Sequence, residues 1–530
     1  MTGISAAMAV SASRAALAAD DYTLARSMPE YVAALGGNVA QDREDAEVAL
    51  SLLAASDYDK LLVEARKPGL KLQTAARLKV ILDREKPRNE IRTQLRATRM
   101  VSRIWNEKTA IESYDKVGRK NPKWDADARK GIQMFVDNSQ GQQRVPLENA
   151  IAAGCNDPFV LYCEARSLEQ WSPADRASID RFYELAMAGF RKSDYPAMRM
   201  AYSAAAFFRY HLNEVFWKDP ATAKQGVPPA VAKELDDARG LSYGIWAKFL
   251  EDKPPSLFVI GLGGQILDNF DSRTIDRKVP FDVMYAALEK AMPNSSTLYL
   301  FKGDFYIKYA WEARGGGYAN TVTPQQWKLF FERLAIADEA LNKAWDRDPH
   351  DERIPTLMLK VELGEHKGPA VERKWFDRAM SVNPDDKSAC YQLMTYLLPR
   401  WYGSDEAVLA FGRECYNSGN WSGGITSQLI TAHNVISSAY TPAEKARYFS
   451  QPAVWHDIQL IEEPYQRVIP GNNSQHSEYA YLASEAGHWD IVQKQFDIMG
   501  NNAVPAKFGG LEVMQGIRNE AASKAKGATP

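Results

Sequence analysis

The sequence has few cysteines, no ordered arrangement of histidines and no nucleotide-binding motif. Four cysteines occur in 530 residues, and none forms a C-x-x-C pair. The histidines are scattered and never reach metal-ligand spacing, so a zinc site is not expected. A glycine run at 261–264 lacks the third glycine of a dinucleotide fingerprint, and no Gly-Lys-Ser/Thr follows it, so we read 261–280 as a loop before a helix. We therefore predict no cofactor, no metal ligands and no catalytic residues.

The sequence also lacks a surplus of charge and a long apolar run. The formal net charge is −2, and Lys and Arg are spread along the chain, so neither a nucleic-acid partner nor a polybasic membrane anchor is expected. No apolar stretch approaches the roughly 20 residues that a membrane helix needs. We therefore predict no membrane insertion.

Alternating β patterns are scarce, whereas helix start signals are frequent. Only 256–260 resembles a strand, and a buried helix segment gives the same pattern. Thr323 and Thr441 each precede a proline and, three residues on, an amide or acidic side chain that completes a capping box. Ser404 opens a further helix that Gly419 ends. Helices are predicted over 72–84 and, with irregular joints, within 88–141.

Two stretches 35 residues apart repeat one pattern. Residues 340–351 align with 375–386, and Lys/Arg, Ala, a large apolar residue, Asp/Asn, Pro and Asp recur in register. This period is typical of stacked helix pairs of the tetratricopeptide kind. Ala344 and Ala379 are small where two helices cross, and Leu341 and Phe376 share their buried face. The copies are degenerate, because Lys360 and Glu372 occupy sites where small residues are expected.

The predicted fold is therefore all-α, a tetratricopeptide-like solenoid of antiparallel helix pairs. We divide it into a leader or disordered tail (1–24), a divergent helical region (25–217), a clearer repeat region (230–518) and a disordered tail (519–530). The Ala- and Ser-rich start resembles a secretory signal but lacks a basic region before its apolar part. A periplasmic or secreted location and a cytoplasmic one both remain open.

Two groups of residues are candidates for binding. Trp311 and Arg314 precede the run Gly315–Gly317, where the backbone can approach a ligand or a neighbouring helix. Arg400, Trp401 and Tyr402 lie together in a turn, and an Arg beside two aromatic rings suits a carboxylate, a sugar face or a peptide. The alternative for both groups is packing between consecutive repeats.

Two further groups of residues bear on structure and chemistry. Cys390 and Cys415 fall on helices joined by one turn, so they are either buried free thiols or a disulfide. His433 is expected to be a buried core residue. Thirteen tryptophans and many acids also fit an enzyme acting on glycans, although nothing marks a particular pair of carboxylates.

From 311 to 433 the chain resembles a family of uncharacterised bacterial proteins with tetratricopeptide-like helices. The resemblance rests on the segments 311–319, 375–380, 398–404 and 411–415. It implies a helical-repeat fold and no established activity.

The predicted function is non-enzymatic binding of a protein or peptide on the concave face of the stack, because repeat stacks leave long surfaces for partners. An all-α barrel enzyme acting on glycans is the alternative. Self-assembly into a scaffold is a third possibility.

Overall fold

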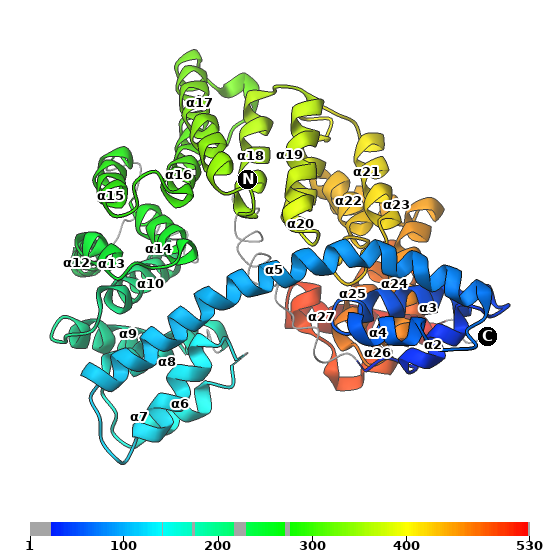
Figure 1. Ribbon diagram of the computed structural model, residues 1–530, viewed down its shortest axis with the longest axis horizontal. Coiled ribbons are helices and arrows are strands. Elements are labelled where there is room, and N and C mark those ends of the chain that lie inside the picture. Colours follow the sequence, from blue (N-terminus) through cyan, green and yellow to red (C-terminus); the bar gives the residue numbers. More distant parts are fainter. Residues whose placement is uncertain (1–22, 140, 172–174, 217–228, 271–275, 528–530) are drawn as a thin grey trace. The chain divides into compact units, whose positions relative to one another are not determined.

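The computed structural model describes residues 23–139, 141–171, 175–216, 229–270 and 276–527, and these residues are helical with no strand (Figure 1). The all-α prediction is therefore confirmed for the described chain. The expected leader falls almost wholly outside these ranges, and so does the segment 218–229 between the two predicted helical regions. None of the described helices combines the length and the apolar character needed to cross a bilayer.

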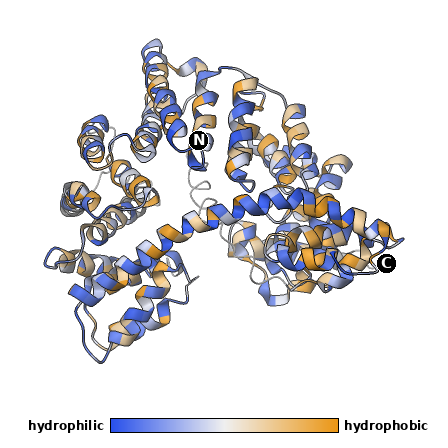
Figure 2. Cartoon of the chain, viewed as in Figure 1, coloured by the Kyte–Doolittle hydropathy of each residue, from blue (hydrophilic) through white to orange (hydrophobic). Residues whose placement is uncertain are grey.

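The chain divides into two compact units, residues 1–94 with 358–530 and residues 95–357. Helices α5 (Leu72–Val117) and α18 (Arg353–Glu365) each contribute residues to both. Within each unit the helices are amphipathic, with hydrophilic and hydrophobic residues interleaved along the ribbon (Figure 2). Each unit therefore buries the apolar sides of its helices against one another.

The first unit joins the beginning of the described chain to its end. Its helices, besides parts of α5 and α18, are α2 (Met28–Ala34), α3 (Ala40–Leu53), α4 (Tyr58–Ala65), α19 (Pro369–Val382), α20 (Lys387–Tyr396), α21 (Asp405–Asn417), α22 (Gln428–Ile436), α23 (Pro442–Phe449), α24 (Pro452–Val468), α25 (Asn473–Ala486), α26 (Trp489–Met499) and α27 (Leu511–Gly527). Short 3-10 turns lie at Ser437–Ala439, Gly500–Asn502 and Pro505–Phe508. One apolar core runs from Tyr31 and Leu50 to Ile458 and Phe496, so α3 packs on α24.

The second unit holds the middle of the chain. Its helices are α6 (Asp125–Val136), α7 (Arg144–Ala152), α8 (Pro158–Trp171), α9 (Arg176–Phe190), α10 (Ala197–Phe216), α12 (Pro229–Gly244), α13 (Trp246–Glu251), α14 (Ser256–Asp268), α15 (Lys278–Ala291), α16 (Ser296–Arg314) and α17 (Pro324–Arg347), with a 3-10 turn at Ala319–Thr321. Its main core is aromatic, and Phe159, Tyr183 and Phe190 are fully buried in it.

The local structure of the two sequence copies is the same. Leu341 and Phe376 are both buried, and Ala344 and Ala379 have no exposed surface. In each copy the helix ends two residues before the proline, at Arg347 and at Val382, and the next helix begins four residues after Pro349 and three residues after Pro384. Asp386 caps α20 by accepting a hydrogen bond from the Ala389 amide, at 3.0 Å. The residues that recur in the sequence therefore end both helices with the same local turn.

The predicted helix signals are found at their expected places. The capping boxes at Thr323 and Thr441 begin α17 and α23. Ser404 accepts from the Ala407 amide at the start of α21, and Gly419, with φ +61°, follows its end. These signals depend on residues close in sequence, which is why the sequence alone identified them.

Two sequence-based expectations about helix limits were wrong. The glycine run read as part of a loop over 261–280 continues the helix α14 (Ser256–Asp268), so of the two alternatives for 256–260 the buried helix segment is the one present. Gly263 is needed inside it for close packing, since a Cβ there would lie 2.6 Å from the Phe301 ring. Helix α5 continues through Pro87, where a helix end was expected. Leu82 and Arg92, on either side of that proline, are both buried, so the helix packs on its unit before and after Pro87.

All four cysteines are buried free thiols. Cys390 and Cys415 are neighbours, and a hydrogen bond to Cys415 together with burial raises the pKa of Cys390 far above its usual value. Of the two alternatives for Cys390 and Cys415, a disulfide or free thiols, the structure has free thiols.

Candidate functional sites

Trp311 and Arg314, two of the predicted binding residues, lie on the last turns of α16. The guanidinium carbon of Arg314 is 5.6 Å from the centroid of the Trp311 ring and 5.3 Å from that of Trp327. Its Nη1 donates to the carbonyls of Gly315 and Gly317, each at 3.1 Å. Arg314 thus binds the segment Gly315–Gly317 to the end of α16, and both Trp311 and Arg314 have partners within the fold.

Arg400, Trp401 and Tyr402 follow α20 in the first unit, so the predicted binding residues form two groups in different units. Arg400 is exposed, and Trp401 is half-buried. Tyr402 donates from its hydroxyl to the Leu363 carbonyl at 3.0 Å, and its ring stacks on His366 with centroids 3.6 Å apart. Tyr402 therefore holds the corner between α18 and α19, while Arg400 is open to solvent.

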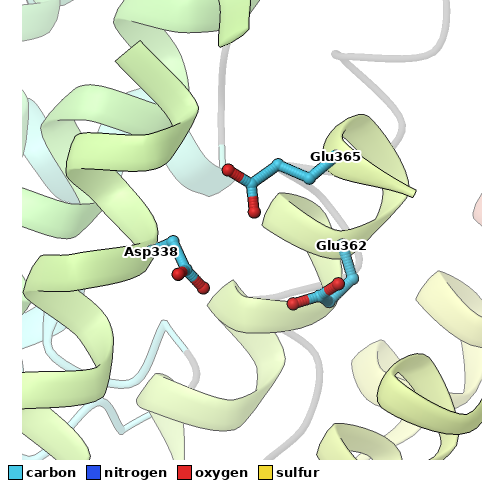
Figure 3. A group of neighbouring side chains, drawn as sticks. All are labelled: Asp338, Glu362 and Glu365. Carbon is cyan, nitrogen blue, oxygen red and sulfur yellow. The ribbon is translucent and has the colours of Figure 1, made fainter. Parts of the chain in front are cut away.

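A buried pair of carboxylates, Glu362 and Glu372, lies at the same corner. Glu362 is on the last turns of α18, as Figure 3 shows together with Glu365, and Glu372 is on the first turn of α19. Glu362 is 1% exposed, and Glu372 is fully buried with no hydrogen-bond partner for either carboxylate oxygen. Asp338, also drawn in Figure 3, is carried by α17 of the second unit.

The surroundings of this acid pair keep one member neutral. Burial, aided by the negative charge of Glu362, raises the pKa of Glu372 to about 9. Lys367 lies 3.5 Å from Glu362 Oε1 and 2.7 Å from Glu365 Oε2. Burial and the neighbouring carboxylates also raise the pKa of Tyr396 to about 12. The pair therefore holds a proton at neutral pH.

A second polar chain runs through the first unit from Tyr448 to Arg413. The Tyr448 hydroxyl is 2.8 Å from His433 Nδ1, and His433 Nε2 is 3.2 Å from Asp457 Oδ2. Arg413 donates to the same Asp457 oxygen at 3.0 Å. His433 is 1% exposed, as the sequence predicted, and burial lowers its pKa against the opposing effect of Asp457. With both ring nitrogens partnered, His433 connects α22 to α23 and α24.

The exposed face of α19 carries a nearly flat patch that is open to solvent. Its lining comes from that one helix and consists of residues on a single helical stripe: Ala370, Arg373, Lys374, Asp377, Arg378 and Ser381. Five of the six are exposed and Arg378 is half-buried. We call these six residues the α19 face. They were not among the predicted binding residues, although their spacing was visible in the sequence.

Contacts behind the α19 face hold two of its arginines in place. Arg373 donates to both carboxylate oxygens of Glu414 on α21, at 3.0 and 2.8 Å, and to Asp377 at 2.8 Å. The guanidinium carbon of Arg378 lies 4.2 Å from the centroid of the buried Trp375 ring. An Arg stacked on an aromatic ring loses little further freedom on binding. The cations of this face are therefore partly ordered before any partner arrives.

No protein-family model and no curated protein matches this chain. The function is therefore inferred from the residues of this chain and their geometry.

Proposed function

We propose that this chain is a non-enzymatic helical-repeat protein, built as a tetratricopeptide-like stack, and that it binds a protein or peptide partner through the α19 face. The observation that carries the proposal is the exposed stripe of polar and charged side chains along that face, while the opposite side of α19 is buried. In repeat proteins each helix pair buries its apolar sides against its neighbours and presents the remaining face to partners.

The recurring geometry of the two sequence copies supports the repeat part of the proposal. Equivalent positions such as Ala344 and Ala379 are equally buried, and the turns after them are built in the same way. Within the first unit, α19 contacts α20, which contacts α22, which contacts α24. Such neighbour-to-neighbour packing is what a stack of helix pairs requires.

The alternative, an enzyme acting on glycans, needs two carboxylates that a substrate can reach. The neighbouring pair Glu362 and Glu372 is 1% and 0% exposed and does not meet this requirement. We therefore place partner binding first.

A photocrosslinking experiment tests the proposal. A benzophenone amino acid is introduced at Lys374 on the α19 face and, as a control, at Lys494, an exposed lysine on α26 of the same unit. Illumination in a lysate of the source organism is expected to join a discrete polypeptide to position 374 and not to position 494. Identical products at both positions, or none at 374, would contradict the proposal.

A further inference from the structure

Cys390 and Cys415, two of the four buried thiols, contact each other. Cys390 lies on the first turn of α20 and Cys415 on the last turn of α21, and their side chains share a hydrogen bond. They are 0% and 4% exposed. A disulfide requires two cysteine side chains that already point towards each other, and this hydrogen bond meets that requirement.

The segment between the two cysteines is a helix hairpin whose turn is held by the backbone. The Tyr402 amide donates to the Tyr396 carbonyl at 3.1 Å, and the Gly403 amide donates to the Leu398 carbonyl at 3.3 Å. The turn therefore forms without help from the cysteines. A covalent bond between positions 390 and 415 would join the two helices away from this turn and restrict the unfolded chain.

We propose that Cys390 and Cys415 are a redox-active pair, which forms a disulfide in an oxidising environment and remains two thiols in a reducing one. The oxidant is a small disulfide of the glutathione kind. One cysteine sulfur, as its thiolate, attacks this disulfide and releases one glutathione; the other sulfur then attacks the mixed disulfide and releases the second. Two electrons pass from the cysteine sulfurs to glutathione, and the two cysteine protons end on the two glutathione thiols.

Burial determines when this exchange takes place. The thiolate is the attacking species, and in the folded chain Cys390 is protonated because burial and its hydrogen bond raise its pKa. Glutathione also has no access to a sulfur that is fully buried. We therefore expect slow oxidation of the folded chain and fast oxidation while the chain refolds. Once closed, the bond is shielded from reductants in the same way, so its state reflects the compartment in which the chain folds.

Peptide mapping tests the proposal. The full chain is unfolded in urea with dithiothreitol, refolded with glutathione disulfide in excess over glutathione, and its remaining thiols are alkylated. Trypsin cuts after Arg400 and Arg413, between the two cysteines, so a bond appears as two joined peptides with a loss of two hydrogens. The joined pair is expected after oxidation and is expected to be absent when dithiothreitol is kept throughout.

The two buried thiols of the second unit are an internal control. The groups that act on Cys155 and Cys163 are carboxylates, arginines and backbone amides, and neither thiol acts on the other. Both are therefore expected to end without a protein disulfide. The rate of oxidation supplies a second readout: glutathione disulfide added to the folded chain should give the joined peptides more slowly than the same reagent present during refolding.

Stability measurements separate a specific bond from chance oxidation. The oxidised wild type is expected to unfold at a higher urea concentration than the reduced protein, because the bond restricts the unfolded chain. Cys415→Ser is expected to lose both the joined peptides and this difference. Cys163→Ser, the same substitution at a buried thiol of the second unit, is expected to retain both.

Several outcomes would overturn the proposal. These are alkylated Cys390 and Cys415 after oxidative refolding, bonds from either of them to Cys155 or Cys163, or a joined pair that leaves the urea midpoint unchanged or lowers it. Since the mapping uses the wild type, its result stands even where a serine variant fails to fold. The bond is also measured without a partner, so it is independent of the crosslink at position 374.

Discussion

Asp348 and Asn383, 35 residues apart in sequence, terminate their helices with the same backbone geometry. Their dihedral angles are φ −145°, ψ 85° and φ −146°, ψ 96°. Each accepts, on its side-chain oxygen, a hydrogen bond of 3.1 Å from the amide two residues on, His350 in one copy and Asp385 in the other. A proline follows each of them, so the turn is closed by the same elements in both copies.

The cap that follows this turn is expected to contribute measurably to stability. Replacing Asp386 by Ala removes the acceptor of the Ala389 amide and is predicted to lower the free energy of unfolding by about 1 kcal/mol. Urea unfolding followed by tryptophan fluorescence measures the change. Lys494→Ala, at an exposed position within α26, is the control and should change it little; equal effects of the two would show that the cap contributes nothing specific.

The buried Glu372 predicts a pH dependence of stability with a definite sign. Its pKa is about 9 in the folded chain and near 4.5 when unfolded, so the folded state binds the extra proton between these values. The contribution of protonated Glu372 to the free energy of unfolding is complete below pH 4.5 and is lost as the pH rises towards 9. Glu372→Gln is a neutral mimic of the protonated acid. Its free energy of unfolding should therefore rise relative to that of the wild type by about 1.4 kcal/mol for each pH unit across this range.

Parallel unfolding curves at several pH values check this expectation. Glu512→Gln, at an exposed glutamate of α27, is the control and should show no such trend. A constant difference between wild type and Glu372→Gln from pH 5 to 9 would contradict a protonated Glu372.

The Tyr448 hydroxyl is expected to matter because it partners a buried ring nitrogen. Tyr448→Phe leaves His433 Nδ1 without its partner and should lower the free energy of unfolding by about 1–3 kcal/mol. Tyr440→Phe, at a neighbouring and exposed tyrosine, should change it by less than about 0.5 kcal/mol. Urea titration distinguishes the two, and a harmless Tyr448→Phe would mean that the Tyr448–His433–Asp457 chain is not a supporting network.

Arg92 joins α5 to two loops of the first unit. It donates to both oxygens of Asp385, at 2.9 and 2.8 Å, to Glu85 at 3.2 Å and to Asn420 at 2.9 Å. Arg92→Met leaves the fully buried Glu85 with one cation fewer and should cost about 3–5 kcal/mol. Lys86→Met, one helical turn and a half away and exposed, is the control. Chemical denaturation of both reports the result, and similar losses would refute a specific role for Arg92.

The sequence predicted those parts of the structure that depend on neighbours in the chain. The capping boxes at Thr323 and Thr441 and the buried small residues Ala344 and Ala379 are local patterns with a direct physical meaning. The sequence also marked Glu372 as a departure from the repeat, although not as an acid that retains its proton.

What could not be predicted depends on residues distant in sequence. Position 263 of α14 requires glycine because Phe301 leaves no room for a side chain, and no nearby residue in the sequence signals that contact. The partners of His433 come from α23 and α24, which only the fold brings to α22. The α19 face is visible as a helical stripe, but its exposure had to be seen in three dimensions.

The most direct test of partner binding measures how tightly the polypeptide crosslinked at position 374 binds to the wild type and to two double variants. Partner binding through the α19 face predicts that Lys374→Glu with Arg378→Glu weakens this affinity about tenfold or more, whereas Arg447→Glu with Lys494→Glu leaves it unchanged. Equal affinity for both variants and the wild type would contradict the account.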